Sequence, residues 1–492
     1  MKRLAPGFFP PIALAPESGP IQRQLRDWFR RAIVEGRLRP GQRVPSTRGM
    51  ARELGVSRAP VLAAYDQLHA EGYLETFHGA GTCVAGAIPQ PARPAPRPSH
   101  APVGAAGRRT SRLAARLMAV DDGPPFRDAG TFRTNLPALE HFPTRVWASL
   151  VARHARRPDA GGLAYSDPMG LLSFREAIAD YLGASRAVRC EPSQVMVVSG
   201  SQQGLQIAVR ALLDPGEAVW LEEPGYPGAR RALLMGGCQP VAAPVDAEGL
   251  ALEAALRDRT DVRAAYLTPS HQFPLGVTMS AARRMRLLAW AAASGGWIVE
   301  DDYDSEYRFG RDPVPSLQGL DADGRVIYLG TFSKVLFPAL RVGYLVIPKD
   351  LVPAFRAVRE ACDLFPPPLL QAALADFIRE GHFARHLRRM RQLYMVRCEA
   401  LASAVRRELS GLLEVVSAEA GMHLVGLLPP GLDDRQVCRA GADLGLSLTP
   451  LSSCFLTPPA RGGLILGYGG AEPEEIREGV RRLGGVIAEL AA

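Results

Sequence analysis

Apolar residues recur at two different spacings along the chain, and the spacing changes near residue 120. In residues 20–35 they recur every three or four positions, which predicts an amphipathic helix. From about residue 121, short continuous apolar runs alternate with helix-period segments such as 202–213 and 281–293. This alternation predicts an α/β domain with a mostly parallel sheet. The apolar runs are 195–198, 218–221, 264–267, 297–299, 326–329 and 344–347.

Residues 46–84 continue the N-terminal pattern with two more predicted helices and a hairpin. Ser46 is placed to cap a short helix, Gly55 supplies a tight turn, and Ser57 is placed to cap a third helix. Two helices joined by a glycine-containing turn are typical of a helix-turn-helix, whose second helix enters the major groove of DNA. Arg58 would then contact base edges, and the Gly-rich hairpin at 77–84 would form a wing. A small helical bundle with solvated arginines is the alternative.

Composition separates three regions. Residues 86–120 are rich in Ala, Pro and Arg, which predicts an extended linker rather than a core. We therefore expect a winged helix-turn-helix domain at 12–85, a linker at 86–120 and the α/β domain at 121–492. Within the α/β domain we expect a large lobe at about 160–350 and a small lobe at about 351–492.

The formal charge of +8 is unevenly distributed. Residues 1–84 hold 12 basic and 7 acidic residues, residues 85–120 hold 6 and none, and the rest hold 40 and 43. The basic first quarter favours double-stranded DNA as a partner. Seven scattered cysteines with no CxxC motif or Cys/His cluster indicate a reducing cytoplasm and no metal site. No apolar run is long enough to predict a membrane span.

The chain has three lysines, Lys2, Lys334 and Lys349, so lysine-specific chemistry has few candidates. Lysine forms Schiff bases with aldehydes, and pyridoxal 5′-phosphate (PLP) is the common partner. Lys334 follows the apolar run 326–329, which places it at the carboxyl end of a strand, where open α/β sheets bind ligands. Asp301 ends another such strand and would hold the cofactor's ring nitrogen protonated, with Tyr303 near the ring oxygen.

A phosphate site is predicted where the run 195–198 opens into a helix. Residues 199–204, Ser-Gly-Ser-Gln-Gln-Gly, would present backbone N–H groups at the helix N-terminus, and Arg341 would add a charged contact. The glycine pattern alone has low specificity. Its value lies in its combination with Lys334 and Asp301.

Two families resemble these segments. Pro-Ser-x-Arg at 45–48, Leu-Gly-Val-Ser-Arg at 54–58, Tyr-x-x-Leu at 65–68 and Gly-x-Gly-Thr at 79–82 resemble the GntR family of winged helix-turn-helix regulators. That resemblance implies DNA contacts from Arg48, Ser57, Arg58, Gly79, Gly81 and Thr82.

The α/β domain resembles fold-type I PLP proteins of the aspartate aminotransferase class. The shared motifs are Ser-Lys with a downstream Arg, Asp-x-Tyr at 301–303 and Pro-Gly-Tyr at 224–226. A further stretch at 165–170 implies that Tyr165 reaches the phosphate bound by a partner subunit. The cofactor contacts that the motifs and the resemblance imply are Lys334, Asp301, Tyr303, Tyr226, Ser201, Gln202, Thr331, Ser333, Arg341 and Tyr165.

A winged helix joined to such a domain resembles the MocR subgroup of GntR regulators, and Thr-Pro-Ser-His-Gln-Phe-Pro-Leu-Gly at 268–276 is close to that subgroup's own motif. The resemblance implies a cytoplasmic, head-to-tail homodimer that regulates transcription and senses an amine or PLP itself through a Lys334 aldimine. Two residues depart from aminotransferases: Phe273 replaces an Asn, and Ile465 replaces the Arg that clamps an α-carboxylate. A working aminotransferase and a DNA-binding protein without PLP remain the alternatives, and any transamination is expected to be residual at most.

Overall fold

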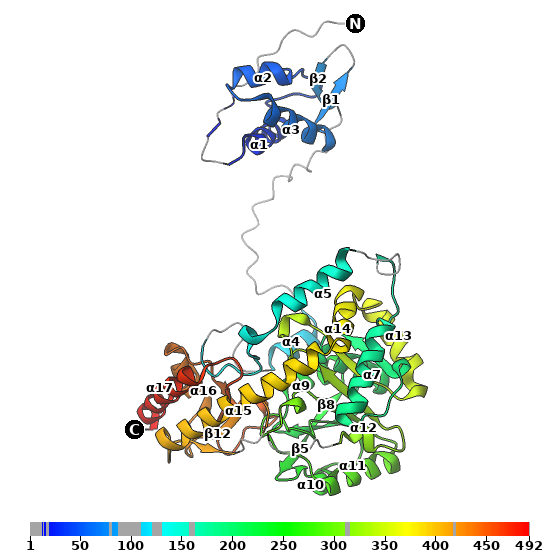
Figure 1. Cartoon of the computed structure of the whole chain (residues 1–492), viewed down its shortest axis with the longest axis vertical. Coiled ribbons are helices and arrows are strands. Elements are labelled where there is room, and N and C mark those ends of the chain that lie inside the picture. The colour runs from blue at the N-terminus through cyan, green and yellow to red at the C-terminus, as the bar shows by residue number, and fades with distance from the viewer. Residues whose placement is uncertain are drawn as a thin grey trace. The chain divides into compact units, whose positions relative to one another are not determined.

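The computed structural model describes residues 12, 14–15, 19–77, 81–86, 110–120, 130–156, 163–309, 315–416 and 420–491. The chain divides into two compact units, residues 1–109 and 110–492 (Figure 1). None of the helices in the described ranges combines the length and apolar character that crossing a membrane requires.

The first unit is a three-helix bundle with a two-stranded antiparallel hairpin. Ser46 Oγ accepts a hydrogen bond of 3.1 Å from Gly49 N, so the predicted cap is confirmed. Ser57 occupies the N-cap position of the third helix, but its side chain makes no capping hydrogen bond, contrary to the prediction. Buried apolar side chains from all three helices form the core, with Phe29 and Tyr65 in edge-to-face contact. The elements are α1 (Ile21–Val34), α2 (Thr47–Glu53), α3 (Arg58–Ala70), β1 (Leu74–Phe77) and β2 (Gly81–Val84).

The second unit is built on an eight-stranded sheet in the order β3-β10-β9-β8-β7-β4-β5-β6. The neighbours from β9 to β5 are parallel, whereas β10 runs antiparallel to both β3 and β9 and β6 runs antiparallel to β5. The predicted mostly parallel α/β sheet is confirmed. Its strands are β3 (Val195–Val198), β4 (Ala218–Glu223), β5 (Gln239–Asp246), β6 (Gly249–Leu250), β7 (Val262–Leu267), β8 (Trp297–Asp302), β9 (Val326–Thr331) and β10 (Gly343–Val346).

Helices cover both faces of this sheet, which explains why its strands are continuous apolar runs. Successive residues of β9 point to opposite faces: Leu329 packs with α8 (Ser201–Leu212), and Tyr328 packs in the cluster that includes α7 (Leu172–Arg186). The α8 face also carries α9 (Pro227–Met235) and α13 (Val352–Asp363). The other face carries α7, α10 (Leu252–Asp258), α11 (Ala281–Ser294), α12 (Leu317–Leu320) and α14 (Pro368–Arg379).

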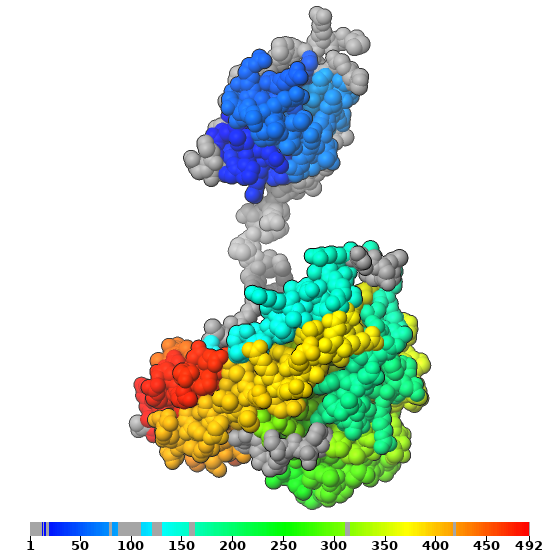
Figure 2. Space-filling model, in the orientation of Figure 1, coloured from blue at the N-terminus to red at the C-terminus, as the bar shows by residue number. Residues whose placement is uncertain are grey.

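A smaller lobe follows, with a four-stranded antiparallel sheet in the order β11-β12-β14-β13. The 27-residue helix α15 (His382–Glu408), yellow to orange in Figure 2, packs against both α14 and α17 (Pro473–Ala491) and so joins the two lobes. Buried Arg397 of α15 bonds Gly469 O and pairs with Glu140 and Glu472. The other elements are β11 (Glu414–Val415), β12 (His423–Leu427), α16 (Asp434–Asp443), β13 (Thr449–Pro450) and β14 (Gly463–Gly467).

Helices α4 (Arg112–Met118) and α5 (Thr144–Arg156) come before α7 in the described part of the second unit. Helix α5 packs on α14, and α4 packs on α9. Just after α4, Val120 O accepts a hydrogen bond from Arg231 Nη2 at 3.1 Å. The interval predicted as a linker therefore contains a helix at its carboxyl end, and residues 87–109 of it lie outside the described residues.

Candidate functional site

Lys334 lies three residues beyond the end of β9, after Phe332 and Ser333. Its side chain is partly buried, and burial lowers the pKa of its amine to about 8, although the nearby carboxylates of Asp304 and Asp301 oppose that change. Near neutral pH about a tenth of such a lysine is neutral, far more than of an ordinary lysine. It is therefore a nucleophilic amine positioned at the end of a strand.

Asp301 lies in β8, the strand paired in parallel with β9, and is almost fully buried. Its Oδ2 accepts a hydrogen bond of 2.8 Å from the Tyr266 hydroxyl, but its Oδ1 has no hydrogen-bond partner among the described residues. Burial raises the pKa of this carboxyl to about 7. A buried carboxylate oxygen without a donor is costly, and the N–H of a protonated pyridine ring is the kind of group that satisfies it.

The predicted phosphate site lies where β3 turns into α8. Gly200, at φ +82°, is the N-cap of α8, and a Cβ at this position would lie 2.7 Å from Arg341 Nη2. Arg341 is exposed and donates to Ser199 O at 3.0 Å, so its guanidinium lies beside the first turn of α8. The buried Ser333 Oγ has no partner among the described residues. A cation, the helix N-terminus and an unsatisfied hydroxyl together suit a phosphate.

The remaining predicted phosphate contacts lie at the same end of the sheet. Thr331 ends β9, and its Oγ1 accepts from Ser333 N at 3.2 Å. Ser201 and Gln202 occupy the first turn of α8 and are partly exposed. The Gln202 amide also donates to Gly228 O at 3.0 Å, which links α8 to the start of α9.

Tyr226 and Tyr303 both pack against Phe273. Their rings lie edge-to-face with the Phe273 ring, at centroid distances of 5.8 and 6.0 Å. Phe273, the residue found in place of an Asn, therefore offers no hydrogen-bonding side chain and forms part of an apolar cluster instead.

A buried pair beside these rings was not predicted from the amino-acid sequence. His271 Nδ1 lies 2.9 Å from Asp304 Oδ1 and 3.0 Å from the Tyr303 hydroxyl. Because Asp304 is an acceptor, it favours the tautomer with a proton on Nδ1, which leaves the Tyr303 proton for another acceptor. The backbone of Gly421 in the small lobe covers the pair, since a Cβ there would overlap His271 and lie 2.8 Å from Asp304 Oδ2.

Two further predicted features are placed by the structure. Ile465 is fully buried in β14. The Arg461 guanidinium donates to Glu414 Oε2 at 2.8 Å and to Leu428 O, and these bonds hold it away from the proposed cofactor site. Tyr165 is 85% exposed and touches Phe365, with ring centroids 5.8 Å apart.

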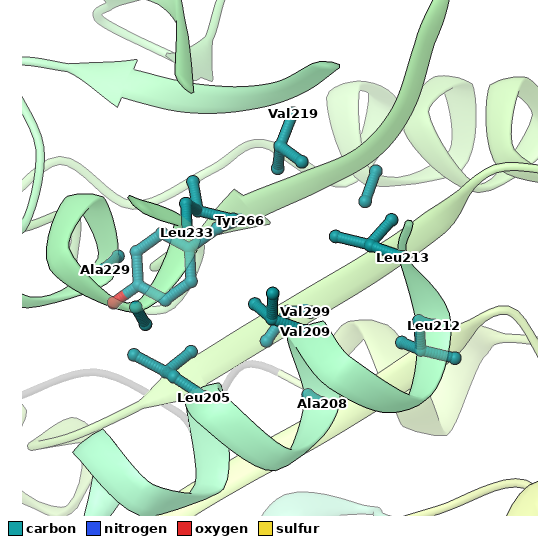
Figure 3. Close-up of a pocket in the computed structure, with 12 residues that line it drawn as sticks. Leu205, Ala208, Val209, Leu212, Leu213, Val219, Ala229, Leu233, Tyr266 and Val299 are labelled. Carbon is teal, nitrogen blue, oxygen red and sulfur yellow. The ribbon is translucent and has the colours of Figure 1, made fainter. Parts of the chain in front are cut away.

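A small void in the large lobe adjoins this site through Tyr266, the residue that bonds Asp301. Figure 3 shows an apolar space between α8 and the sheet, in which the Tyr266 ring carries the one labelled side-chain oxygen. Its volume of about 20 Å³ and its apolar lining mark a packing void rather than a ligand site.

In the N-terminal unit, the predicted DNA-facing residues Arg48, Ser57 and Arg58 are exposed, whereas Gly81 and Thr82 are half-buried. Arg48 lies in the first turn of α2 and Arg58 begins α3, with Arg58 Nε 3.4 Å from Thr47 Oγ1. Ser57 is exposed, Gly81 and Thr82 lie in β2, and Gly79 falls outside the described residues. Arg43 was not predicted from the sequence. It is an exposed residue whose backbone forms a β-bridge with Cys83 of β2, and its guanidinium would lie 3.0 Å from a Cβ on Gly81.

Comparison with known proteins matches both units. Residues 21–84 match the gntR family of bacterial regulatory proteins, and residues 135–482 match aminotransferase class I and II. The chain is 44% identical to the probable rhizopine catabolism regulatory protein MocR of Rhizobium meliloti, over 94% of this chain and 93% of that protein. The chain belongs to the MocR-type GntR regulators.

This MocR-type regulator is also similar to a second regulator and to a solved aminotransferase structure. It is 33% identical to the pyridoxine biosynthesis transcriptional regulator PdxR of Corynebacterium glutamicum, over 95% and 96% of the two chains. Among solved structures it is similar to the α-aminoadipate aminotransferase LysN of Thermus thermophilus, complexed with N-(5′-phosphopyridoxyl)-L-leucine. That likeness has a TM-score of 0.69 at 32% identity and covers 78% of this chain and 97% of LysN. The match to complete regulators confirms the DNA-binding regulator over the aminotransferase alternative, and the second unit has the fold of PLP-dependent aminotransferases.

Proposed function

We propose that this MocR-type regulator binds PLP through Lys334 and changes its binding to promoter DNA when an amine effector, or PLP itself, enters the same cleft. The observation that carries the proposal is the Oδ1 of buried Asp301, which has no hydrogen-bond partner among the described residues and lies in the strand beside the one that leads to Lys334. When bound, PLP supplies an aldehyde that reacts with amines and a pyridinium ring that withdraws electrons.

Each predicted residue would have a defined task. The Lys334 amine would hold the cofactor covalently, and Asp301, positioned by Tyr266, would accept from the ring nitrogen. Tyr303 would donate to the ring oxygen, because His271 and Asp304 leave its proton available. Tyr226 would stack near the ring. The phosphate would be held by Ser201, Gln202, Thr331, Ser333 and Arg341, together with the partner's Tyr165.

The second part of the proposal concerns the DNA-binding half. A winged helix at 12–85 would contact operator DNA, joined by a linker at 86–120 to the effector domain at 121–492. The contacts would come from Arg48, Ser57, Arg58 and the wing residues Gly79, Gly81 and Thr82, in a cytoplasmic protein. The exposure of Arg48, Ser57 and Arg58 and the positive charge of the first unit support this assignment.

A head-to-tail homodimer is the third part. An apolar surface on the effector domain supports it, since large apolar side chains exposed together favour a protein interface. The surface comes from two segments, 163–172 and 364–369. A hydrogen bond from Leu171 N to Gln371 Oε1 connects the first segment to α14, the helix that begins within the second. The surface consists of Leu163, Tyr165, Leu172, Leu364 and Leu369, between 40% and 85% exposed.

The chain's lysines provide a matched test of cofactor binding. PLP added to the purified protein should give a visible absorption band that Lys334→Ala abolishes. Lys349→Ala should keep it, because Lys349 is an exposed residue paired with Glu191. A band that survives in Lys334→Ala would contradict the site.

Activity and DNA-binding assays on the same purified protein distinguish a regulator from an enzyme. Sustained turnover of an amino donor with a keto acid would contradict a purely regulatory role for the cofactor. Promoter binding that changes with PLP or an amine, without turnover, would support it.

A further inference from the structure

An apolar wall closes one side of the proposed cofactor site. It consists of buried side chains from both lobes, against which Tyr226 and Tyr303 pack directly. Because these two tyrosines are the proposed ring contacts, the wall borders the cofactor position. Its core members are Phe273, Val425, Leu451, Cys454 and Ile465.

Hydrogen bonds fix the wall to the loop that carries Tyr226. Gly225 N donates to Cys454 O at 2.8 Å, and the Glu223 carboxylate accepts from Leu456 N at 2.8 Å and from Thr457 N at 3.0 Å. These bonds connect the small-lobe part of the wall to the large-lobe loop that carries Tyr226. The position of the wall therefore does not depend on the packing of a single side chain.

Four basic side chains in the segments that border this site are each engaged elsewhere or uncharged. Arg461 is engaged with Glu414, and Arg341 lies with the proposed phosphate site. Burial lowers the pKa of His423 to about 4, so its ring is neutral, and His271 is engaged with Asp304.

Several carboxyl groups lie close to the Lys334 amine. Asp304 and Asp301 are the carboxylates that act on the Lys334 amine, and Asp301 in turn interacts with buried Glu222. Burial raises the pKa of Glu222 to about 7, and its Oε1 has no partner among the described residues. A ligand carboxylate here would be desolvated beside carboxyl groups and without a counter-ion, whereas an ammonium group would be attracted.

We propose that the effector is a primary amine whose amine-bearing carbon carries no carboxylate and whose body is uncharged. This inference rests on the proposed function and names the ligand class of the same cleft. The apolar wall would cover the body of the effector, and the acidic groups would draw its amine toward Lys334.

Matched ligand pairs test the proposal on the full-length, PLP-loaded protein. We would titrate 2-phenylethylamine against L-phenylalanine, and 3-methylbutylamine against L-leucine, because the members of each pair differ by one carboxylate. The readouts are the visible absorption band and the midpoint of thermal unfolding. Each amine should bind at least about tenfold more tightly than its amino acid, the effect of one unpaired buried charge.

Amino acids that bind as tightly as the amines, or no response to either amine, would overturn the inference. The failure of the proposed function looks different: no visible band forms in the wild type, or the band survives in Lys334→Ala.

A substitution in the wall provides a second test. Ile465→Arg places a cation beside the ring and should shift preference toward the amino acid of each pair, whereas Ile465→Met, which keeps an apolar side chain, should keep the preference for the amine. A folded Ile465→Arg protein with unchanged preference would contradict the placement of the wall. If Ile465→Arg does not fold, Phe273→Arg, on the large-lobe side of the wall, makes the same test, and the wild-type titration decides the ligand class in either case.

Discussion

Replacing Asp301 with Asn should change the stability of the cofactor-free protein and its affinity for PLP in opposite directions. Burial moves the pKa of this carboxyl from 3.8 to about 7, so the folded protein pays for ionising it as the pH rises through that interval. By pH 8 the cost is on the order of 4 kcal/mol. Asn keeps an acceptor for Tyr266 but carries no charge. Because Lys334 loses a favourable neighbour, we expect a net gain of about 1–3 kcal/mol in unfolding free energy at pH 8.

The cofactor should respond in the opposite way. An amide cannot take the place of a carboxylate beside a protonated ring nitrogen, and a hydrogen bond to a charged group contributes about 1.5–3 kcal/mol. The Kd for PLP should therefore rise about 10- to 100-fold. Urea unfolding of the cofactor-free protein at pH 5 and 8, together with titration of the visible band, measures both effects. The gain in stability should be small at pH 5, where the buried carboxyl is protonated in the folded wild type.

The neighbouring acid Asp302 provides the matched control. It lies on the same strand and is equally buried, but it pairs with Arg186 at 2.7 Å and accepts from Tyr328. Asp302→Asn should destabilise the cofactor-free protein, because it leaves a buried guanidinium without its counter-charge. An Asp301→Asn protein that binds PLP as tightly as wild type, or that loses stability at pH 8 as Asp302→Asn does, would refute the assignment of Asp301.

Three more outcomes follow from other contacts. Arg58→Ala should weaken promoter binding about tenfold and leave the PLP band unchanged in a gel-shift and absorbance comparison, with exposed Arg52→Ala as the control for lost charge. Tyr266→Phe should lower the unfolding free energy of the cofactor-free protein by about 1.5–3 kcal/mol at pH 8 and by less at pH 5, because its hydroxyl bonds the Asp301 carboxylate. Tyr165→Ala should weaken PLP binding in equilibrium dialysis without unfolding the subunit, since this exposed side chain adds little to the core; unchanged PLP affinity would count against a shared site.

The large-lobe framework was predictable because each of its signals is local. β8 and β9 are continuous apolar runs that end at polar residues, and parallel strands bring their carboxyl ends to one edge of the sheet. Asp301 and Lys334 could therefore be placed at one edge of the sheet from the amino-acid sequence alone. The Ser46 cap followed from the same kind of local reasoning, because its partner lies three residues away.

Contacts between distant segments were not predictable in this way. His271 and Asp304 are 33 residues apart, and their role depends on Gly421, a backbone segment of the other lobe. Arg461 is close to Ile465 in sequence, yet Glu414 holds its guanidinium away from the cleft. Ser57 shows that a local signal can also fail. The residue occupies the predicted N-cap position, but its side chain makes no capping hydrogen bond.

The proposed cofactor site lies between the two lobes, and this position would determine which ligands can act as signals. A ligand shifts a conformational equilibrium only if it binds the two arrangements with different affinity. Here Phe273 and His271 belong to the large lobe, whereas Ile465 and Gly421 belong to the small lobe, and both pairs meet at the proposed ring position. An effector that fills the space beside the wall would contact both lobes at once, so its affinity would depend on their separation. A ligand held by the phosphate site alone would contact Gly200 and Arg341 of the large lobe and would favour neither arrangement. We therefore expect the part of the effector that touches the wall, rather than its amine, to determine the regulatory response.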